Sequence, residues 1–405
     1  MRLYRNLVAA AVSCLHDIFI KDLNPESTLR DRTKKNRSWG SRDRRFLQSI
    51  VYDVIRSMRL YVHVLNKRPV SIDDFTAITA IYLVDQQIDL PDWDDFSSFD
   101  AEDIHSKLEI SKKIRHLQYA IPEWLDSLGY SHYKEQWNDV LEKLEDRAPV
   151  FIRINRSKTD RKGLIEKLTQ AGVSVSTVND SKHESALQID SKARLTSLPV
   201  FNEGYFEIQD LSSQMIAPYM ELSPEMIVVD ACAGAGGKML HIADVMDNKG
   251  LIHCFDIHAV KLKNLQKRAR RTHVSIYQTY LVPKIKHWDS FNGIADRVLI
   301  DAPCTGLGTV RRKPILKWRL NERWYRLILK SQQQVFQQYA HMCKRDGLLI
   351  YATCSILPSE NNEQVQHFLE TSIGRSFELV DQLQILPSSM GGDGFYMAKL
   401  KRNDL

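Results

Sequence analysis

An apolar segment, a glycine-rich loop and a helical segment follow one another between residues 226 and 246. Four apolar residues ending in an acid, Met226-Ile-Val-Val-Asp230, predict a buried strand of a parallel sheet. Gly234, Gly236 and Gly237 in the loop permit positive φ and let a ligand approach the backbone closely. Helical spacing of apolar residues resumes at Met239. The whole stretch predicts an α/β fold in which a helix N-terminus faces a nucleotide-like ligand.

The spacing around the glycines separates the possible cofactors. A dinucleotide fingerprint needs a third glycine where Met239 stands, and a phosphate loop needs a hydroxyl residue after Lys238, so both motifs fail. The next apolar segment, Leu251–Asp256, ends in an acid 22 residues after Gly234, where a carboxylate meets a ribose diol. A glycine-rich loop followed by an acid that can bind a ribose, without the glycine pattern that binds a pyrophosphate, indicates S-adenosylmethionine. A purely structural turn of another α/β fold is the alternative.

Composition excludes several classes of protein. The 405 residues are 43% hydrophobic, which is enough for buried cores, and carry a net charge of +6. The six cysteines have no metal-ligand spacing, so we expect no bound metal. No signal peptide and no apolar run of about 18 residues is evident. We therefore expect a cytoplasmic protein with reduced thiols that does not insert into membranes.

Residues 1–146 are predicted to be all-helical, because apolar residues such as Ile50, Val54 and Met58 recur at helical spacing. The stretch 29–45 within them carries eight Lys and Arg against two Asp. Such runs are often solvated surface loops, but neutralisation of phosphates by cations also dominates RNA binding. Its candidate RNA contacts are Arg42, Arg44 and Arg45. From residue 147 the pattern becomes mixed, with strands predicted at 150–155 and 173–177 around a helix at 161–170.

Two further apolar segments end in polar tips that contain cysteine. Asp296–Asp301 leads to Cys304, and Gly347–Thr353 leads to Cys354. Ligands of a doubly wound sheet lie at the carboxyl ends of its strands, so both cysteines are predicted beside the methyl donor. A thiolate that adds to carbon 6 of a pyrimidine makes carbon 5 nucleophilic enough to accept a methyl group. The alternative is that both are small buried apolar residues, which is how we interpret Cys14, Cys254 and Cys343.

These motifs resemble the signatures of a known family. The segments 230–238, 301–306 and 352–361 are similar to motifs of the Sun/Nop family of RNA cytosine-5 methyltransferases, and 392–400 is similar to its final hairpin. The helical part resembles the NusB-like domain of the bacterial RsmB subgroup, which methylates 16S rRNA. The resemblance implies three parts: an all-helical NusB-like RNA-binding domain (1–146), a small α/β RNA-binding subdomain and connector (147–220), and a Rossmann-like class I methyltransferase domain (221–405).

The resemblance also implies roles for individual residues. Cys354 matches the attacking nucleophile, Cys304 the cysteine that assists breakdown of the adduct, and Asp301 a carboxylate near both the cytosine and the cofactor. The expected cofactor-binding residues are Cys232, Ala233, Gly234, Ala235, Gly236, Gly237, Lys238, Asp256 and Asp301. Further candidates for guiding RNA by charge are Arg311, Arg312, Lys313 and Lys317.

One feature of the family is missing. An acid is expected after the third strand, near the adenine, but the spacing points to Val282, and Thr279 is the nearest polar residue. We expect a monomeric, S-adenosylmethionine-dependent enzyme that methylates carbon 5 of a cytosine in RNA, foremost in small-subunit rRNA. The same chemistry on tRNA is one alternative. A ribosome-assembly factor that binds RNA but has weak or lost activity is the other. Met239 argues against a nicotinamide oxidoreductase.

Overall fold

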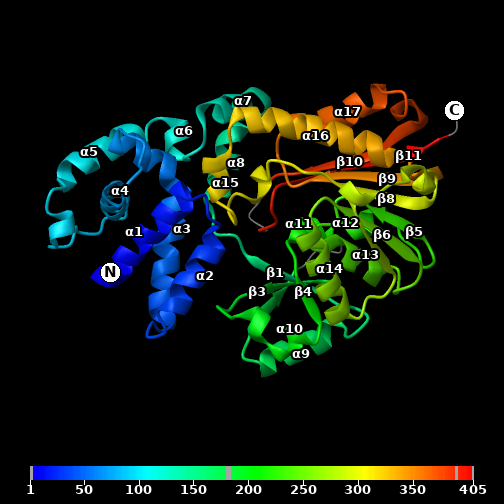
Figure 1. The fold of residues 1–405 in the computed structure, drawn as a ribbon, viewed down its shortest axis with the longest axis horizontal. Helices are drawn as coiled ribbons and strands as arrows, with labels where there is room; N and C mark the ends of the chain where they lie inside the picture. Colours follow the sequence, from blue (N-terminus) through cyan, green and yellow to red (C-terminus); the bar gives the residue numbers. More distant parts are fainter. Residues whose placement is uncertain (1–2, 179–183, 388–390, 404–405) are drawn as a thin grey trace. The chain divides into compact units, whose positions relative to one another are not determined.

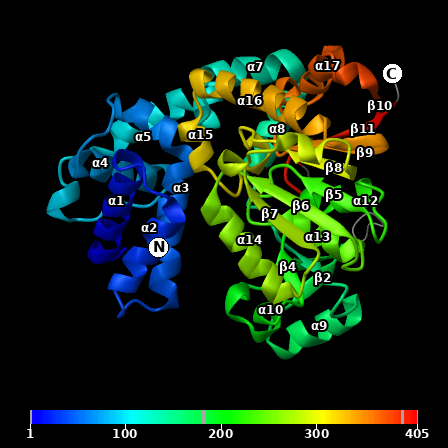
Figure 2. The ribbon, with the colours of Figure 1, turned by 45° about the vertical axis from the view of Figure 1, so that its right-hand side comes forward.

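The computed structural model describes residues 3–178, 184–387 and 391–403. Their packing defines two units. One unit consists of Met1–Glu145 together with Arg312–Glu322, and the other consists of Asp146–Arg311 together with Arg323–Leu405. Figure 1 labels most of the helices and strands of both, and Figure 2 adds the labels of β2 and β7. Among the described residues, no helix combines the length and apolar character needed to cross a membrane.

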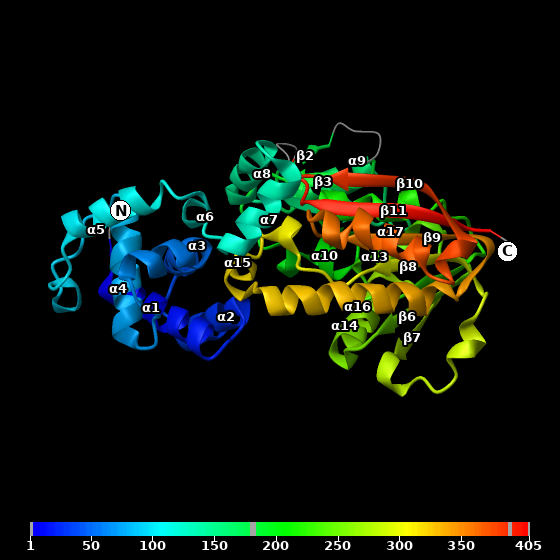
Figure 3. The same cartoon turned by 90° about the horizontal axis from the view of Figure 1, so that it is seen from above.

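The first unit is helical throughout its described residues, as the apolar spacing predicted. Its central element is the amphipathic helix α3, which buries Ile50, Val54 and Met58 against the neighbouring helices α1 and α4 (Figure 3). The helices of this unit are α1 (Arg5–Ile20), α2 (Pro25–Lys35), α3 (Ser41–Leu65), α4 (Ile72–Asp85), α5 (Ala101–Ser111), α6 (Arg115–Gln118), α7 (Glu123–Tyr133), α8 (Gln136–Glu145) and α15 (Ile315–Arg319).

The basic stretch 29–45 is largely helical rather than a loop. Helix α2 begins at Pro25, and the side chain of Asn24 caps it by accepting a hydrogen bond from the Ser27 amide at 3.1 Å. An asparagine followed by proline favours the start of a helix. The high charge of the stretch suggested a surface loop instead. Trp39, within the same stretch, is buried in the core of this unit.

Helix α15 is distant in sequence from the rest of the first unit but is built into it. Ile315 belongs to the same apolar core as α3, and Arg59 of α3 donates hydrogen bonds to the carbonyls of Lys317 at 3.0 Å and Trp318 at 3.2 Å. From sequence, these residues were expected in the methyltransferase domain. Their local pattern does not reveal that their hydrogen-bond partner Arg59 lies 258 and 259 residues earlier.

The second unit contains two sheets. The smaller has the order β2-β3-β1-β4 and is antiparallel; the larger has the order β10-β11-β9-β8-β5-β6-β7. The strands are β1 (Val150–Ile154), β2 (Val175–Thr177), β3 (Ala186–Ile189), β4 (Phe206–Ile208), β5 (Ile227–Asp230), β6 (Leu251–Asp256), β7 (Tyr277–Leu281), β8 (Ala295–Asp301), β9 (Cys343–Thr353), β10 (Phe377–Ile385) and β11 (Phe395–Arg402).

Helices cover both faces of the larger sheet, as expected for strands that are apolar on both sides. One apolar core joins it to α12, α13 and α14, and a second core joins its other face to α16 and α17 (Figure 1). The smaller sheet packs with α9 and α10 (Figure 2). The helices are α9 (Arg161–Gln170), α10 (Pro199–Asn202), α11 (Leu211–Gln214), α12 (Ile216–Tyr219), α13 (Gly237–Val245), α14 (Ala259–Thr272), α16 (Glu322–Ala340) and α17 (Asn362–Glu370).

The order of the larger sheet fixes where a ligand binds. Strands β5 to β9 are parallel, so β5, β6, β8 and β9 all end at one edge, at Asp230, Asp256, Asp301 and Thr353. The chain proceeds outward from β5 in one direction through β6 and in the other through β8. The edge beside β5 is therefore the topological switch point, where open α/β sheets bind their ligands.

Candidate active site

The glycine loop between β5 and α13 packs against the end of β6. Gly234 and Gly236 have φ of 55° and 83°, and a Cβ on Gly236 would lie 2.7 Å from the Leu265 side chain. The carboxylate of Asp256 accepts hydrogen bonds from the amides of Gly234 at 2.9 Å and His258 at 2.7 Å. The predicted ribose acid is thus held rigidly beside the loop that is predicted to bind the rest of the cofactor.

The strand at the switch point ends in a buried carboxylate, Asp230. It is 1% exposed, and neither carboxylate oxygen receives a well-formed hydrogen bond from the described part of the chain. Burial and the neighbouring Asp301 raise the pKa of Asp230 to about 7. Buried carboxylates ordinarily have partners, so this one is suited to a cationic ligand. S-adenosylmethionine is cationic at its sulfonium and amino groups, so the residues present fit this cofactor.

The adenine side of the site is apolar. Ile257, directly after the ribose acid, is 61% exposed although it is a large aliphatic residue. Thr279 accepts a hydrogen bond from Gln266 at 3.0 Å, and Val282 packs partly buried against the aromatic cluster around Phe255. None of these three residues replaces the missing acid. An apolar surface on which the adenine packs is the alternative to an acid. Its signal in the sequence is the aliphatic residue directly after the strand-end acid, and this signal was not recognised.

The two candidate cysteines lie side by side. Cys304 follows β8 and Cys354 follows β9, and their Sγ atoms are 3.3 Å apart with both thiols reduced. The structure therefore brings together the pair that the sequence placed at neighbouring strand ends. The hydrogen bond with Cys354, together with burial, raises the pKa of Cys304 well above its usual value. Cys304 is therefore disfavoured as a thiolate.

Lys238 connects the glycine loop to the cysteine edge. Its Nζ lies 2.6 Å from Oδ2 of Asp301 at the end of β8. Burial lowers the pKa of Lys238, but the charges of Asp301, Cys354 and Asp230 outweigh burial and leave the pKa raised. Lys238 is therefore charged in the free protein and lies close to the predicted nucleophile, Cys354. From sequence it was expected only in the cofactor loop, and this pairing was not predicted.

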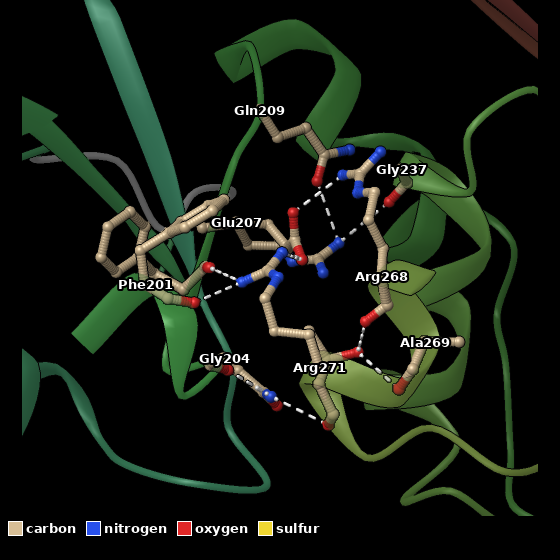
Figure 4. Close-up of polar contacts among 12 residues, drawn as sticks. Phe201, Gly204, Glu207, Gln209, Gly237, Arg268, Ala269 and Arg271 are labelled. Carbon is tan, nitrogen blue, oxygen red and sulfur yellow. Dashed lines mark hydrogen bonds and ion pairs between the residues drawn. The ribbon is translucent and has the colours of Figure 1, made fainter. Parts of the chain in front are cut away.

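The smaller sheet supports the glycine loop through Arg268 of α14. Arg268 of α14 donates to the Ala235 carbonyl at 2.9 Å and to Glu207 of β4 at 2.8 Å. Figure 4 shows Arg268 and Arg271 both directed toward Glu207. The fully buried Arg153 of β1 donates to Gln209 at 2.9 Å, and burial lowers its pKa to about 10. These contacts tie the backbone of the loop to the small subdomain.

The candidate RNA-contacting cations divide into two groups. Arg42, Arg44 and Arg45 are exposed on the first turns of α3, Lys313 is exposed and Arg312 is partly exposed. The remaining two, Arg311 and Lys317, require a correction.

Arg311 and Lys317 are buried. Arg311 is 3% exposed and forms an ion pair with Asp393 at 3.1 Å, and Lys317 is 2% exposed and pairs with Glu145. The prediction that these two cations guide RNA is therefore wrong, because their charges are already satisfied inside the protein.

The fold and the site together define a methyltransferase of the doubly wound type. In solved structures, the chain superposes on PH0851 with a TM-score of 0.83 at 23% identity, covering 99% of this chain and 100% of that one. It superposes on NSun6 from Pyrococcus horikoshii with SFG with a TM-score of 0.62 at 20% identity, covering 71% and 99%. The cofactor is S-adenosylmethionine.

Sequence comparison identifies the family. A family model for the 16S rRNA methyltransferase RsmB/F matches residues 217–401, and a model for the ferredoxin-like domain of RsmF/B-like methyltransferases matches residues 121–196. The chain is 32% identical over 305 residues to a probable ribosomal RNA small subunit methyltransferase B from Synechocystis sp., covering 70% of this chain and 67% of the relative. It is 31% identical to ribosomal RNA small subunit methyltransferase B from Photorhabdus laumondii, covering 69% and 66%. The chain belongs to the RsmB/F family of methyltransferases. These alignments span about two thirds of the relatives' length.

Proposed function

We propose that this protein methylates carbon 5 of a cytosine in RNA, foremost in small-subunit rRNA, through a covalent adduct at carbon 6. The observation that carries the proposal is the separation of 3.3 Å between the thiols of Cys304 and Cys354, beside the Lys238–Asp301 pair. Two thiols at this distance are within reach of adjacent atoms of one pyrimidine ring. The names of the relatives, which refer to the RNA of the small ribosomal subunit, support the RNA class.

In the first step, the Cys354 thiolate adds to carbon 6 of the cytosine and forms a carbon–sulfur bond. The ring electrons shift so that a double bond joins carbons 4 and 5, and nitrogen 3 takes up a proton. This proton comes from the Lys238 ammonium and reaches nitrogen 3 through the Asp301 carboxylate, to which Lys238 is hydrogen-bonded, so that no unpaired charge builds on the ring. Carbon 5 is now nucleophilic, and bound S-adenosylmethionine supplies its methyl group there.

In the second step, Cys304 releases the product. The hydrogen bond with Cys354 is the largest cause of the raised pKa of Cys304, and it weakens once Cys354 is bonded to carbon. Cys304 can then lose its proton to solvent and remove the proton from carbon 5. The double bond between carbons 5 and 6 re-forms, the carbon–sulfur bond breaks, and nitrogen 3 returns its proton to Asp301. The same arrangement of the two cysteines thereby gives them different roles in successive steps of the reaction.

RNA has to present the cytosine unpaired or flipped out of its stack to reach this edge. We further infer that the helical unit is a NusB-like RNA-binding domain. The exposed Arg42, Arg44 and Arg45 at the start of α3 support this inference. The exposed Lys313 offers a further phosphate contact.

Trapping of the adduct tests the chemistry. With S-adenosylmethionine and transcribed 16S rRNA fragments, Cys304→Ala is expected to accumulate a protein–RNA adduct that survives denaturing electrophoresis. Cys354→Ala is expected to form no adduct and transfer no methyl group. Bisulfite sequencing of the product locates the modified cytosine, and tRNA serves as the competing substrate. RNA binding without adduct or methyl transfer in the wild type would favour the assembly-factor alternative.

A further inference from the structure

One buried carboxylate receives hydrogen bonds from both cysteine-bearing loops. Glu360 is 0% exposed and lies in a 3-10 turn, Pro358–Glu360, shortly after β9. Thr305 directly follows Cys304, and Ser355 directly follows Cys354. The side chains of Thr305 and Ser355 both donate to Glu360. The carboxylate therefore lies where the two catalytic loops meet.

Glu360 has a full set of neutral donors. Its Oε1 accepts from the Thr305 amide at 2.8 Å and from Gln332 at 3.2 Å, and its Oε2 accepts from the Thr305 hydroxyl at 2.5 Å and from the Ser355 hydroxyl. Four donors match the four acceptor sites of an ionised carboxylate. Burial raises the pKa of Glu360, and the hydrogen bonds from Ser355, Thr305 and Gln332 oppose that rise because a protonated carboxyl would have to give up one of them.

The backbone around Glu360 is held in place separately. The Tyr351 hydroxyl donates to the Glu360 carbonyl at 2.8 Å, and the Asn361 side chain donates to the Ser355 carbonyl at 3.1 Å. The position of the carboxylate is thus fixed by β9 and by the turn itself. Its four acceptor bonds are then available to set the positions of the two loops.

The charge of Glu360 also acts on the nearby thiol. It contributes to the raised pKa of Cys304, after the hydrogen bond with Cys354 and after burial. An anion beside Cys304 disfavours a second negative charge there. Cys304 is therefore held in its neutral thiol form.

We propose that Glu360 is a positioning residue that ties the Cys304 loop to the Cys354 loop through Thr305 and Ser355 and keeps Cys304 in its thiol form, which leaves the attack to Cys354. This inference rests on the proposed cysteine chemistry and adds a residue to it. Glu360 itself touches no reacting atom. It works through Thr305 and Ser355.

Thiol alkylation tests the proposal without RNA or cofactor. Iodoacetamide labelling of the folded wild type, followed by peptide mass spectrometry across a pH series, is expected to show Cys354 reacting faster than Cys304. Glu360→Gln keeps the shape but removes the charge and replaces one acceptor with a donor. We expect Cys304 labelling at neutral pH to rise about tenfold, which corresponds to about one pKa unit. Glu363→Gln, the same chemical change at an exposed glutamate three residues further on, is the matched control and should leave the labelling unchanged.

Kinetics supply a second readout. In Glu360→Gln, formation of the covalent RNA adduct is expected to slow, whereas the pH profile of adduct breakdown, which requires ionised Cys304, is expected to shift to lower pH. If this variant does not fold, Thr305→Val and Ser355→Ala each remove one hydroxyl donor and are expected to move both readouts in the same direction. Unchanged thiol selectivity in folded variants would overturn the proposal. Changed selectivity in a protein that never methylates RNA would instead refute the proposed function alone.

Discussion

Lys238 and Asp301 join the cofactor loop to the cysteine edge through an ion pair of 2.6 Å. Lys238 lies in the first turn of α13, whereas Asp301 ends β8, so the pair spans the topological switch point of the sheet. Each charge is only partly exposed, and each offsets the desolvation of the other. In the proposed mechanism, this one contact couples binding of the methyl donor to activation of the cytosine.

Removal of the Lys238 ammonium should reduce the rate of methyl transfer more than it reduces the stability of the fold. Lys238→Met retains the apolar stem but leaves Asp301 without its partner and nitrogen 3 without a proton source. We expect single-turnover methyl transfer to fall about 100- to 1,000-fold, as when a preorganised donor is removed. Lys263→Met, an exposed lysine on α14, is the control and should retain the wild-type rate. Normal transfer by Lys238→Met would exclude a role in the reaction.

Truncation of the Arg268 side chain should weaken cofactor binding from a distance. Arg268→Ala frees the Ala235 carbonyl and leaves Glu207 with one fewer cation, so the glycine loop is no longer braced. We expect the Kd for S-adenosylmethionine, measured by calorimetry, to rise about tenfold. Arg270→Ala, exposed on the same helix, should bind normally. Equal affinities for the two variants would show that the brace does not matter.

The buried Asp230 should make stability depend on pH. Its pKa is raised from 3.8 to about 7, so the folded protein holds a proton that the unfolded chain releases. The free energy of unfolding should therefore fall as pH rises from about 4 to about 7, and remain low above that range. Asp230→Asn removes this dependence and should stabilise the protein at pH 8 by up to about 4 kcal/mol. Urea unfolding at several pH values measures it, with the exposed Asp247→Asn as control.

The same carboxylate predicts the pH dependence of cofactor binding. A cationic ligand favours ionised Asp230, so binding should release a proton at pH values below about 7. The affinity for S-adenosylmethionine should therefore be higher at pH 8 than at pH 6. In Asp230→Asn the affinity should be lower overall and flat over this range. Calorimetry in buffers of different ionisation enthalpy reports the proton directly, and no release from the wild type would contradict the assignment.

The cations of the helical unit should separate into RNA contacts and structural residues. Replacement of Arg42, Arg44 and Arg45 by Ala should weaken RNA binding and reduce the salt slope by about one for each phosphate that is no longer neutralised. Lys317→Met should lower the thermal unfolding temperature, because Glu145 then has no lysine partner, without altering the salt slope. A changed salt slope in Lys317→Met would restore its role as an RNA contact.

The elements that form the site were largely predictable from local sequence. The strands ending at Asp256 and Asp301 are short apolar runs with an acid at the tip, and parallel pairing alone places their ends at one edge. The meeting of Cys304 and Cys354 follows from the same rule, since β8 and β9 are neighbours. The catalytic roles of these cysteines stay a prediction.

Partners distant in sequence were not predictable. Arg311 and Lys317 look like surface cations because their partners Asp393 and Glu145 are 82 and 172 residues away. Glu360 stands within a family-like motif, but only the fold shows that it receives both cysteine loops. Burial of a charge depends on tertiary pairing, which composition and periodicity do not report.

The chain passes between its two units at residues 145–146, 311–312 and 322–323, because α15 completes the helical core. A truncation before residue 146 would therefore not yield a catalytic half with a clean boundary. It would leave Ile315 and Trp318 stripped of their apolar neighbours in a segment between the cysteines Cys304 and Cys354. Exposed apolar side chains promote association, so such a fragment is expected to aggregate. We therefore expect that the truncated chain cannot be produced on its own as a stable protein.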